Sequence, residues 1–357
     1  NNSVVRRYSF NYRIMKNING SLSFLSNITE YGSDNVTSLP PVKFEYNIMR
    51  PGWNDKSSLW KLPPDVLFLS SSNTDLGVRL DDVNGDGLLD ILDGGRGPSN
   101  SCGDNEKKVY INNGTGWENS SWRLPICFTF YGDGEDEGAR LADVNGDGLV
   151  DILVAKRGVG NSCQSNDKTA YINNGTGWVQ NDSWEPPECF IYYSPSGQDD
   201  GLRMADINRD GLIDFISGER SASNVCGDNE KRAYINNKNG WIEDDSWEPP
   251  TCFVLYSPAG EDEGMRITEV NGDGLPDIIE SKDGAGKNTY INTGNGWVLD
   301  NSTFIAPEWL VSDKDEGVRL ADINGDGLVD FVKGKEVGFA CDDVHKIAYI
   351  NKGNGWI

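Results

Sequence analysis

The sequence predicts an all-β protein, and more narrowly a β-propeller of six four-stranded blades, five of which carry an acidic loop. Three observations support this prediction. A nine-residue acidic run begins at each of Asp82, Asp143, Asp206, Glu269 and Asp322. Behind every run, a Tyr-Ile-Asn motif is followed by Gly-Trp in the same order. No segment has the sustained apolar period of about 3.6 residues that an amphipathic helix requires.

Within each repeat, short β-branched and aromatic runs bounded by Gly, Asn and Pro predict four strands. In the second repeat these runs are residues 139–142, 152–155, 169–173 and 189–193. The acidic runs follow one another at steps of 61, 63, 63 and 53 residues. Leucine-rich and ankyrin arrays repeat after about 20–33 residues, whereas a step near 60 suits one propeller blade.

The first 70 residues carry no acidic loop, but apolar runs at 4–12, 22–31, 42–48 and 66–69 also predict strands. This segment is either a sixth blade that lacks the loop or the end of a preceding domain. Residues 71–357 then form the five loop-bearing blades. The last of these blades is incomplete, since the sequence stops after its Gly-Trp. We therefore expect the native polypeptide to continue beyond Ile357.

The acidic runs predict calcium sites. Positions 1, 3, 5 and 9 offer carboxylate or amide oxygens, and the backbone carbonyl of the leucine at position 7 points inward in the expected turn. Calcium takes 6–8 oxygen ligands, whereas softer metals favour His or Cys. The candidate ligands are Asp82, Asn84, Asp86, Leu88 and Asp90; Asp143, Asn145, Asp147, Leu149 and Asp151; Asp206, Asn208, Asp210, Leu212 and Asp214; Glu269, Asn271, Asp273, Leu275 and Asp277; Asp322, Asn324, Asp326, Leu328 and Asp330.

The resemblance of these runs to an EF-hand ends at position 12, where no bidentate Glu recurs and flanking strands replace helices. About five calcium ions would bring the formal net charge of -24 to about -14. Two runs depart from the pattern, because Glu269 stands at position 1 and Arg209 replaces the glycine at position 4. We predict that the Glu269 loop binds calcium most weakly.

Six cysteines occur as pairs at equivalent places in three repeats. The pairs are Cys102 with Cys127, Cys163 with Cys189, and Cys226 with Cys252. The repeat that contains Trp297 lacks both members of the pair, and this joint absence predicts three disulfides within the repeats. Disulfides indicate an oxidising compartment. Cys341 occupies the first position of a fourth pair, whose second member would lie beyond the sequence.

Composition narrows the function classes. The acidic balance of 56 Asp+Glu against 32 Lys+Arg disfavours nucleic-acid binding and adhesion to anionic lipid. No apolar run approaches the roughly 18 residues of a membrane span, so no direct membrane insertion is expected. Frequent Asn-x-Ser/Thr sequons predict a glycosylated, secreted or cell-surface protein. The candidate sites are Asn19, Asn27, Asn35, Asn113, Asn119, Asn174, Asn181 and Asn301.

The run Asp-x-Asn-Gly-Asp-Gly-Leu-x-Asp between strands resembles the FG-GAP/VCBS repeats of integrin-α-like propellers. The stretch Arg6-Arg7-Tyr8, with Leu39-Pro40-Pro41 and Phe44-Glu45-Tyr46 after it, is similar to the segment that precedes the propeller in SpvB-like and Tc-toxin B-subunit proteins. The resemblance implies a non-catalytic propeller that docks onto a partner, with calcium held by the five acidic loops. It also implies that the propeller closes one end of a shell built by later RHS repeats.

The leading prediction is therefore an extracellular, calcium-stabilised, non-catalytic docking module for a protein or glycan partner. A hydrolase or lyase is a weaker alternative, because the sequence has a single histidine, His345, and no Gly-x-Ser-x-Gly elbow. A lectin is the third alternative, in which Trp122, Trp184 and Trp247 would stack on sugars rather than pack between blades. The arginine three residues before each acidic run could recognise an acidic ligand or pair with a nearby carboxylate.

Overall fold

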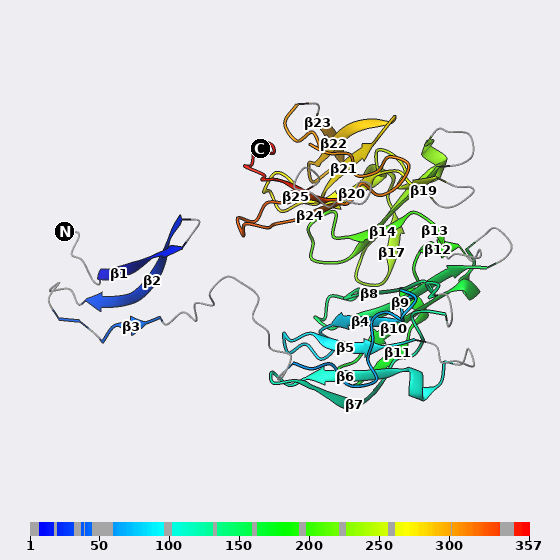
Figure 1. Ribbon diagram of the computed structural model, residues 1–357, viewed down its shortest axis with the longest axis horizontal. Coiled ribbons are helices and arrows are strands. Elements are labelled where there is room, and N and C mark those ends of the chain that lie inside the picture. The colour runs from blue at the N-terminus through cyan, green and yellow to red at the C-terminus, as the bar shows by residue number, and fades with distance from the viewer. Residues whose placement is uncertain are drawn as a thin grey trace. The chain divides into compact units, whose positions relative to one another are not determined.

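The computed structural model describes residues 7–17, 20–31, 37–38, 40–44, 60–95, 102–130, 134–158, 163–192, 198–220, 226–255, 261–300, 302–335 and 346–357. The chain divides into two compact units, Asn1–Lys56 and Ser57–Ile357. Within the described ranges the elements are strands and five single-turn 3-10 helices, so the all-β prediction is confirmed (Figure 1). No helix among the described residues is long and apolar enough to cross a membrane.

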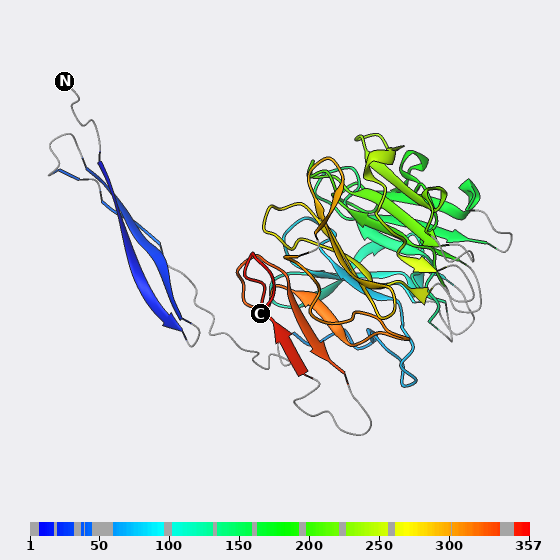
Figure 2. The same ribbon diagram turned by 90° about the horizontal axis from the view of Figure 1, so that it is seen from above.

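The smaller unit is a three-stranded antiparallel sheet, visible as the blue ribbon in Figure 2. Its strands are β1 (Arg7–Asn17), β2 (Gly20–Tyr31) and β3 (Val42–Lys43). A bulge between Asn11 and Tyr12 shifts the register of β1 against β2. Three of the four strands predicted in this region are therefore present. The fourth, at 66–69, is not a strand: Leu69 forms only an isolated bridge with Asp75, and both residues lie in the larger unit.

Among its described residues, the larger unit contains five sheets, one for each acidic run, which follow one another in chain order (Figure 1). We call them the first to the fifth sheet. The first has β4 (Val78–Asp81), β5 (Asp90–Asp93), β6 (Lys108–Asn112) and β7 (Trp117–Arg123); the second, β8 (Ala139–Ala142), β9 (Asp151–Arg157), β10 (Lys168–Asn173) and β11 (Trp178–Gln180); the third, β14 (Leu202–Ala205), β15 (Asp214–Arg220), β16 (Lys231–Asn236) and β17 (Trp241–Glu243); the fourth, β20 (Met265–Thr268), β21 (Asp277–Lys282), β22 (Gly286–Asn292) and β23 (Trp297–Asp300); the fifth, β24 (Val318–Ala321), β25 (Asp330–Gly334) and β26 (Lys346–Tyr349).

Short elements join these sheets. The 3-10 helices are η1 (Asp104–Glu106), η2 (Ser165–Asp167), η3 (Asp182–Trp184), η4 (Asp228–Glu230) and η5 (Asp245–Trp247). The two-residue strands β12 (Ile191–Tyr192) and β13 (Gln198–Asp199) extend the second sheet, and β18 (Val254–Leu255) and β19 (Glu261–Asp262) extend the third.

The outer strand of the second sheet differs from the sequence prediction. The predicted fourth strand of the second repeat, 189–193, is only the short β12, which pairs in parallel with the end of β9 and antiparallel with β13. The fourth meander strand is β11, which follows the Asn-Gly turn and pairs with β10. The Tyr-Ile-Asn and Gly-Trp motifs thus form the two arms of one hairpin. The apolar run that suggested a strand is buried instead as Cys189, Phe190 and Ile191, each 2% exposed.

Consecutive sheets bury an apolar core between them. At the junction of the second and third sheets, Val144, Leu153 and Phe190 pack with Leu202 and Phe215. Each Ser-Trp indole then meets the Gly-Trp indole of the next sheet edge to face. These pairs are Trp122 with Trp178 at 5.3 Å, Trp184 with Trp241 at 5.4 Å, and Trp247 with Trp297 at 6.4 Å between ring centroids. The packing alternative for these tryptophans is confirmed, since Trp184 and Trp247 are each 7% exposed and Trp122 packs against the core between the first and second sheets.

A buried asparagine bonds each sheet to the one before it. The side chain of Asn236, at the end of the Tyr-Ile-Asn motif, donates 2.8 Å to the Val144 carbonyl in the preceding acidic run and 3.1 Å to its own Ile213 carbonyl. The same cross-sheet bond joins Asn173 to Val83, Asn292 to Ile207, and Asn351 to Val270. The acidic runs are therefore part of the interface between sheets.

Candidate functional site

All five acidic runs lie in the turn between the first two strands of a sheet, so the 25 candidate ligands fall in five equivalent places. The last Asp of each run opens the second strand, as in the pairing of Ala142 with Asp151. In the second run the backbone wraps around Asp143. One oxygen of Asp143 accepts from the amides of Gly146 at 2.8 Å and Asp147 at 3.1 Å, and the other accepts from Gly148 at 2.8 Å.

Glycines make this turn possible. Gly146 and Gly148 have φ values of 75° and 85°, a region that is costly for residues with a Cβ. A Cβ on Gly146 would also lie 2.7 Å from Leu212, the position-7 leucine of the next run. In the second run, position 4 therefore favours glycine both for its backbone angle and for the packing of this loop against the next.

The Asp at position 9 has a different environment from the other ligands. Asp151 is 0% exposed, and its two oxygens accept from the amides of Val144 at 3.0 Å and Asn173 at 2.7 Å. Burial, and then the carboxylates of Asp147 and Asp143, raise the pKa of Asp151 to about 7. The pKa values of Asp214 and Asp277 are raised to about 7 for the same reasons.

This donor set fits calcium. Each oxygen of Asp151 still has a lone pair for a metal after accepting one amide. The carboxylates of Asp143 and Asp147 raise the pKa of Asp151 because they repel its charge, and a divalent cation among them would offset that repulsion. Bound calcium would supply structural cross-linking of the turn rather than chemistry. The position-7 carbonyls remain predicted ligands.

The fourth loop departs from this pattern in two ways. The longer side chain of Glu269 accepts from the amides of Asn271 at 2.7 Å and Gly272 at 2.6 Å, one residue earlier than Asp143 does. In addition, Arg209 of the third run, at φ 61°, donates to the Asp273 carbonyl at 2.5 Å. A guanidinium beside a calcium ligand repels the ion. Both features support the prediction that the Glu269 loop binds calcium most weakly, and that affinity order stays a prediction.

The arginine three residues before each run pairs with a carboxylate. Arg203 lies 2.7 Å from Asp199, and equivalent pairs join Arg79 to Asp75, Arg140 to Asp136, Arg266 to Asp262, and Arg319 to Asp315. The ion-pair alternative for these arginines is confirmed.

The three predicted disulfides are present. Cys102–Cys127, Cys163–Cys189 and Cys226–Cys252 have Cα–Cα distances of 5.9, 5.7 and 5.7 Å. Of the sequon asparagines, Asn113, Asn119, Asn174 and Asn181 are exposed, and Asn27 is half-buried. Asn19, Asn35, Asn301, Cys341 and His345 lie outside the described residues.

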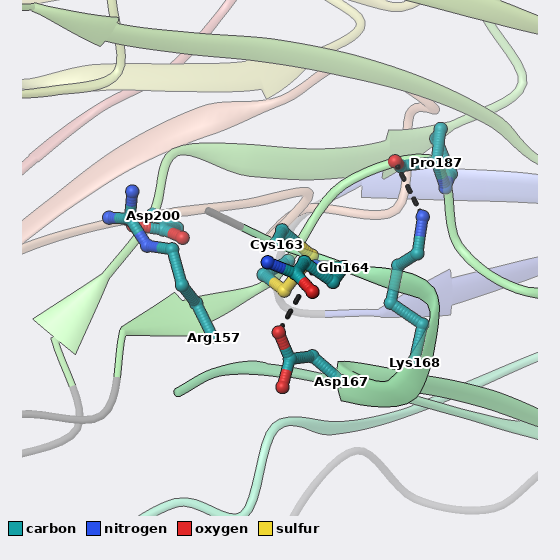
Figure 3. Close-up of a disulfide and its surroundings, with 8 residues drawn as sticks. Arg157, Cys163, Gln164, Asp167, Lys168, Pro187 and Asp200 are labelled. Carbon is teal, nitrogen blue, oxygen red and sulfur yellow. Dashed lines mark hydrogen bonds and ion pairs between the residues drawn. A yellow bond between two sulfur atoms is a disulfide. The ribbon is translucent and has the colours of Figure 1, made fainter. Parts of the chain in front are cut away.

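The sequence prediction missed a cavity of about 560 Å³ at the junction of the second and third sheets. Its lining includes Arg157, Glu188, Asp200, Glu219 and Tyr234. Figure 3 shows Arg157 reaching toward Asp200 beside the disulfide of Cys163, while Lys168 donates to the Pro187 carbonyl on the other side. Burial raises the pKa of Asp200 to about 7 despite the Arg157 ion pair. A signal was present in the sequence, since Glu219 stands where three other repeats have lysine.

Comparison with known families places these repeats. The model of the FG-GAP-like repeat matches residues 82–154, 143–217 and 269–332, which together span more than half of the chain. The chain belongs to the FG-GAP-like repeat family. The matched segments begin at acidic runs, in agreement with the resemblance seen in the sequence. No curated protein matches the sequence.

Three solved structures are similar to this FG-GAP-like repeat protein. A lectin of Agrocybe aegerita that recognises non-reducing terminal N-acetylglucosamine has 18% identity and a TM-score of 0.47, covering 78% of this chain and 64% of its own. The Tc holotoxin pore of Photorhabdus luminescens has 18% identity and a TM-score of 0.46 over 99% of this chain and 14% of its own. The biofilm matrix protein Bap1 of V. cholerae has 15% identity and a TM-score of 0.29, covering 78% and 38%. The chain thus spans less than two thirds of each.

Proposed function

We propose that the chain forms a calcium-stabilised β-propeller that serves as an extracellular, non-catalytic binding module. The observation that carries this proposal is the coupling of acidic loops to sheet junctions. The side chain of Asn236 donates to the Val144 carbonyl in the preceding acidic run. The backbone amide of Asn236 donates to the carboxylate of Asp214, at position 9 of its own run. Calcium that orders a run therefore also orders the junction beside it. The five sheets are blades in this proposal, and the sixth blade remains a prediction.

The other parts of the proposal have separate support. Three disulfides favour an oxidising, extracellular setting. Exposed sequon asparagines at hairpin turns, such as Asn113 and Asn174, are suitable for glycosylation. The binding role rests on family membership together with the polar cavity, and a protein or glycan partner remains the proposed ligand. The absence of catalysis is likewise part of the proposal.

A calcium titration monitored by thermal unfolding tests this function. Because calcium binds the folded loops and not the unfolded chain, saturation should raise the melting temperature by many degrees, and EGTA should reverse the rise. Magnesium at the same concentration is the control, since it requires a stricter octahedral geometry. A melting temperature that is the same in excess EGTA and in calcium would refute structural calcium.

A further inference from the structure

The cavity between the second and third sheets lacks two lysines that pair with carboxylates at equivalent places in other sheets. Two kinds of lysine–carboxylate pair recur along the chain. One lies within a sheet, and the other joins a sheet to the segment before it.

The first pair links the end of a sheet's second strand to the acid that precedes its first strand. It joins Lys156 to Glu137 at 3.4 Å, Lys282 to Glu263 at 2.6 Å, and Lys335 to Glu316 at 2.7 Å. In the third sheet the equivalent residues are Glu219 and Asp200, so a second carboxylate replaces the lysine. Arg157 of the second sheet contacts both, pairing with Asp200 and lying 3.5 Å from Glu219.

The second pair centres on an acid that precedes the sheet. Glu308 accepts from the Tyr349 hydroxyl at 2.8 Å and from the Lys333 ammonium at 2.8 Å. Asp65 likewise accepts from the Tyr110 hydroxyl at 2.9 Å and from the Lys108 ammonium.

At the cavity this second pair lacks its lysine. Glu188 accepts from the Tyr234 hydroxyl at 2.9 Å, but no lysine reaches it from the described residues. Ser217 stands at the position of Lys333, three residues after the last Asp of its run. Arg232 stands at the position of Lys108 and pairs instead with Glu243 at 3.0 Å.

Polar groups therefore face the cavity with room beside them. Ser217 is 5% exposed and lines the cavity, and its hydroxyl makes no hydrogen bond to the described residues. Four carboxylates, those of Glu188, Asp200, Glu219 and Glu230, line the cavity against the two guanidinium groups of Arg157 and Arg232. Burial, and then repulsion by neighbouring carboxylates such as Glu188, raise the pKa values of Asp200 and Glu219 above their usual range. These features indicate that the cavity favours an added positive charge.

We propose that this cavity binds the ammonium group of a lysine side chain presented by a partner protein. The ammonium would take the place that Lys333 takes at the last junction, donating to Glu188 and to the Ser217 hydroxyl. Lysine fits because its three donors match acceptors spread around a compact point charge. A stacked sugar does not fit, since tyrosine is the only aromatic residue that lines the cavity among the described residues. This inference specifies the ligand of the proposed binding function. It rests on that function only in taking the partner to be a protein.

Ligand-observed NMR on the full chain in saturating calcium tests the proposal. The probe is a capped Gly-Lys-Gly peptide, and its matched control carries Nε-acetyl-lysine, which keeps the length and loses the charge. We expect the acetylated peptide to bind at least about tenfold more weakly, because a charge-assisted hydrogen bond is lost. Equal affinity for the two peptides, or binding of glucosamine without the lysine peptide, would overturn the proposal.

The variant S217K supplies the missing lysine from within the chain. By analogy with Lys333, its ammonium should bind Glu188 and occupy the proposed ammonium site. The affinity for the lysine peptide should then fall at least about tenfold. The comparison variant S217A leaves the cavity open but removes one neutral acceptor of the ammonium, so it should weaken the peptide only about two- to fivefold, less than S217K does. E188Q is the second variant, for use if S217K does not fold, and it should lower the affinity for the lysine peptide by a similar factor. Undiminished peptide binding by S217K or by E188Q contradicts the proposal. The two proposals fail in different experiments. A melting temperature that does not depend on calcium would refute the proposed function, whereas only the peptide titrations can refute lysine binding.

Discussion

The cross-sheet asparagine offers a sharp test of how the sheets are held together. Asn236 is 3% exposed, and N236A would remove its bonds to the carbonyls of Val144 and Ile213 together with the bond its oxygen accepts from Lys238 at 2.9 Å. An unpaired buried group costs about 1–3 kcal/mol. Three such groups, partly rehydrated, should lower the free energy of unfolding by about 3–4 kcal/mol.

Asn112 provides the matched control within the same chain. It occupies the same place in the first sheet and is 7% exposed, but among the described residues its side chain donates only to the Leu89 carbonyl, at 3.1 Å, and accepts from the Gly114 amide at 2.9 Å. N112A should therefore cost about 1 kcal/mol less than N236A, the value of one cross-sheet hydrogen bond. Urea unfolding in saturating calcium, followed by tryptophan fluorescence, measures both. Equal losses for the two variants would refute the argument that the cross-sheet bond stabilises the junction.

Three further predictions concern the loops, the cavity and the disulfides. Restoring the consensus with E269D and R209G should raise the calcium affinity of the fourth loop, and calorimetry that resolves no change in the weakest site would contradict this expectation. The pKa of Asp200 is about 7 in the folded state and near 3.8 in the unfolded state, so between these pH values the folded state binds one more proton. The stability that this proton contributes is full below pH 4 and is lost as pH rises through 7. In saturating calcium, D200N should flatten the stability–pH profile between pH 4 and 7, and an unchanged slope would show that Asp200 does not titrate there. Replacing Cys163 and Cys189 together by serine opens a loop of 26 residues and should cost about 3 kcal/mol in urea unfolding, whereas an unchanged midpoint would mean that the bond does not constrain the unfolded chain.

Local chemistry explains why much of the site was predictable. An Asp-x-Asn-Gly-Asp-Gly run encodes its own turn, because the glycines permit positive φ and the first Asp accepts the amides that the turn exposes. The disulfides were predictable since Cys163 and Cys189 appear and disappear together with the equivalent pairs. Both inferences depend only on residues close in sequence or on repetition.

Burial and pairing across sheets were not predictable in this way. The run at 189–193 has a strand-like composition, yet Phe190 is buried at a junction and β11 takes the outer edge. An apolar run has the same composition whether it pairs in a sheet or packs against one, so only the tertiary structure decides between the two.

The sequence alone determined the repeat, the five acidic turns and the three cysteine pairs, because each is set by residues that lie near one another or recur in register. Only the tertiary structure decided what Ser217 and Glu219 do. In the sequence they are ordinary polar substitutions, and their meaning depends on Arg157 and Glu188, which belong to the neighbouring repeat. Electrostatic energy depends on distance and burial in space, and those quantities exist only once the sheets have packed.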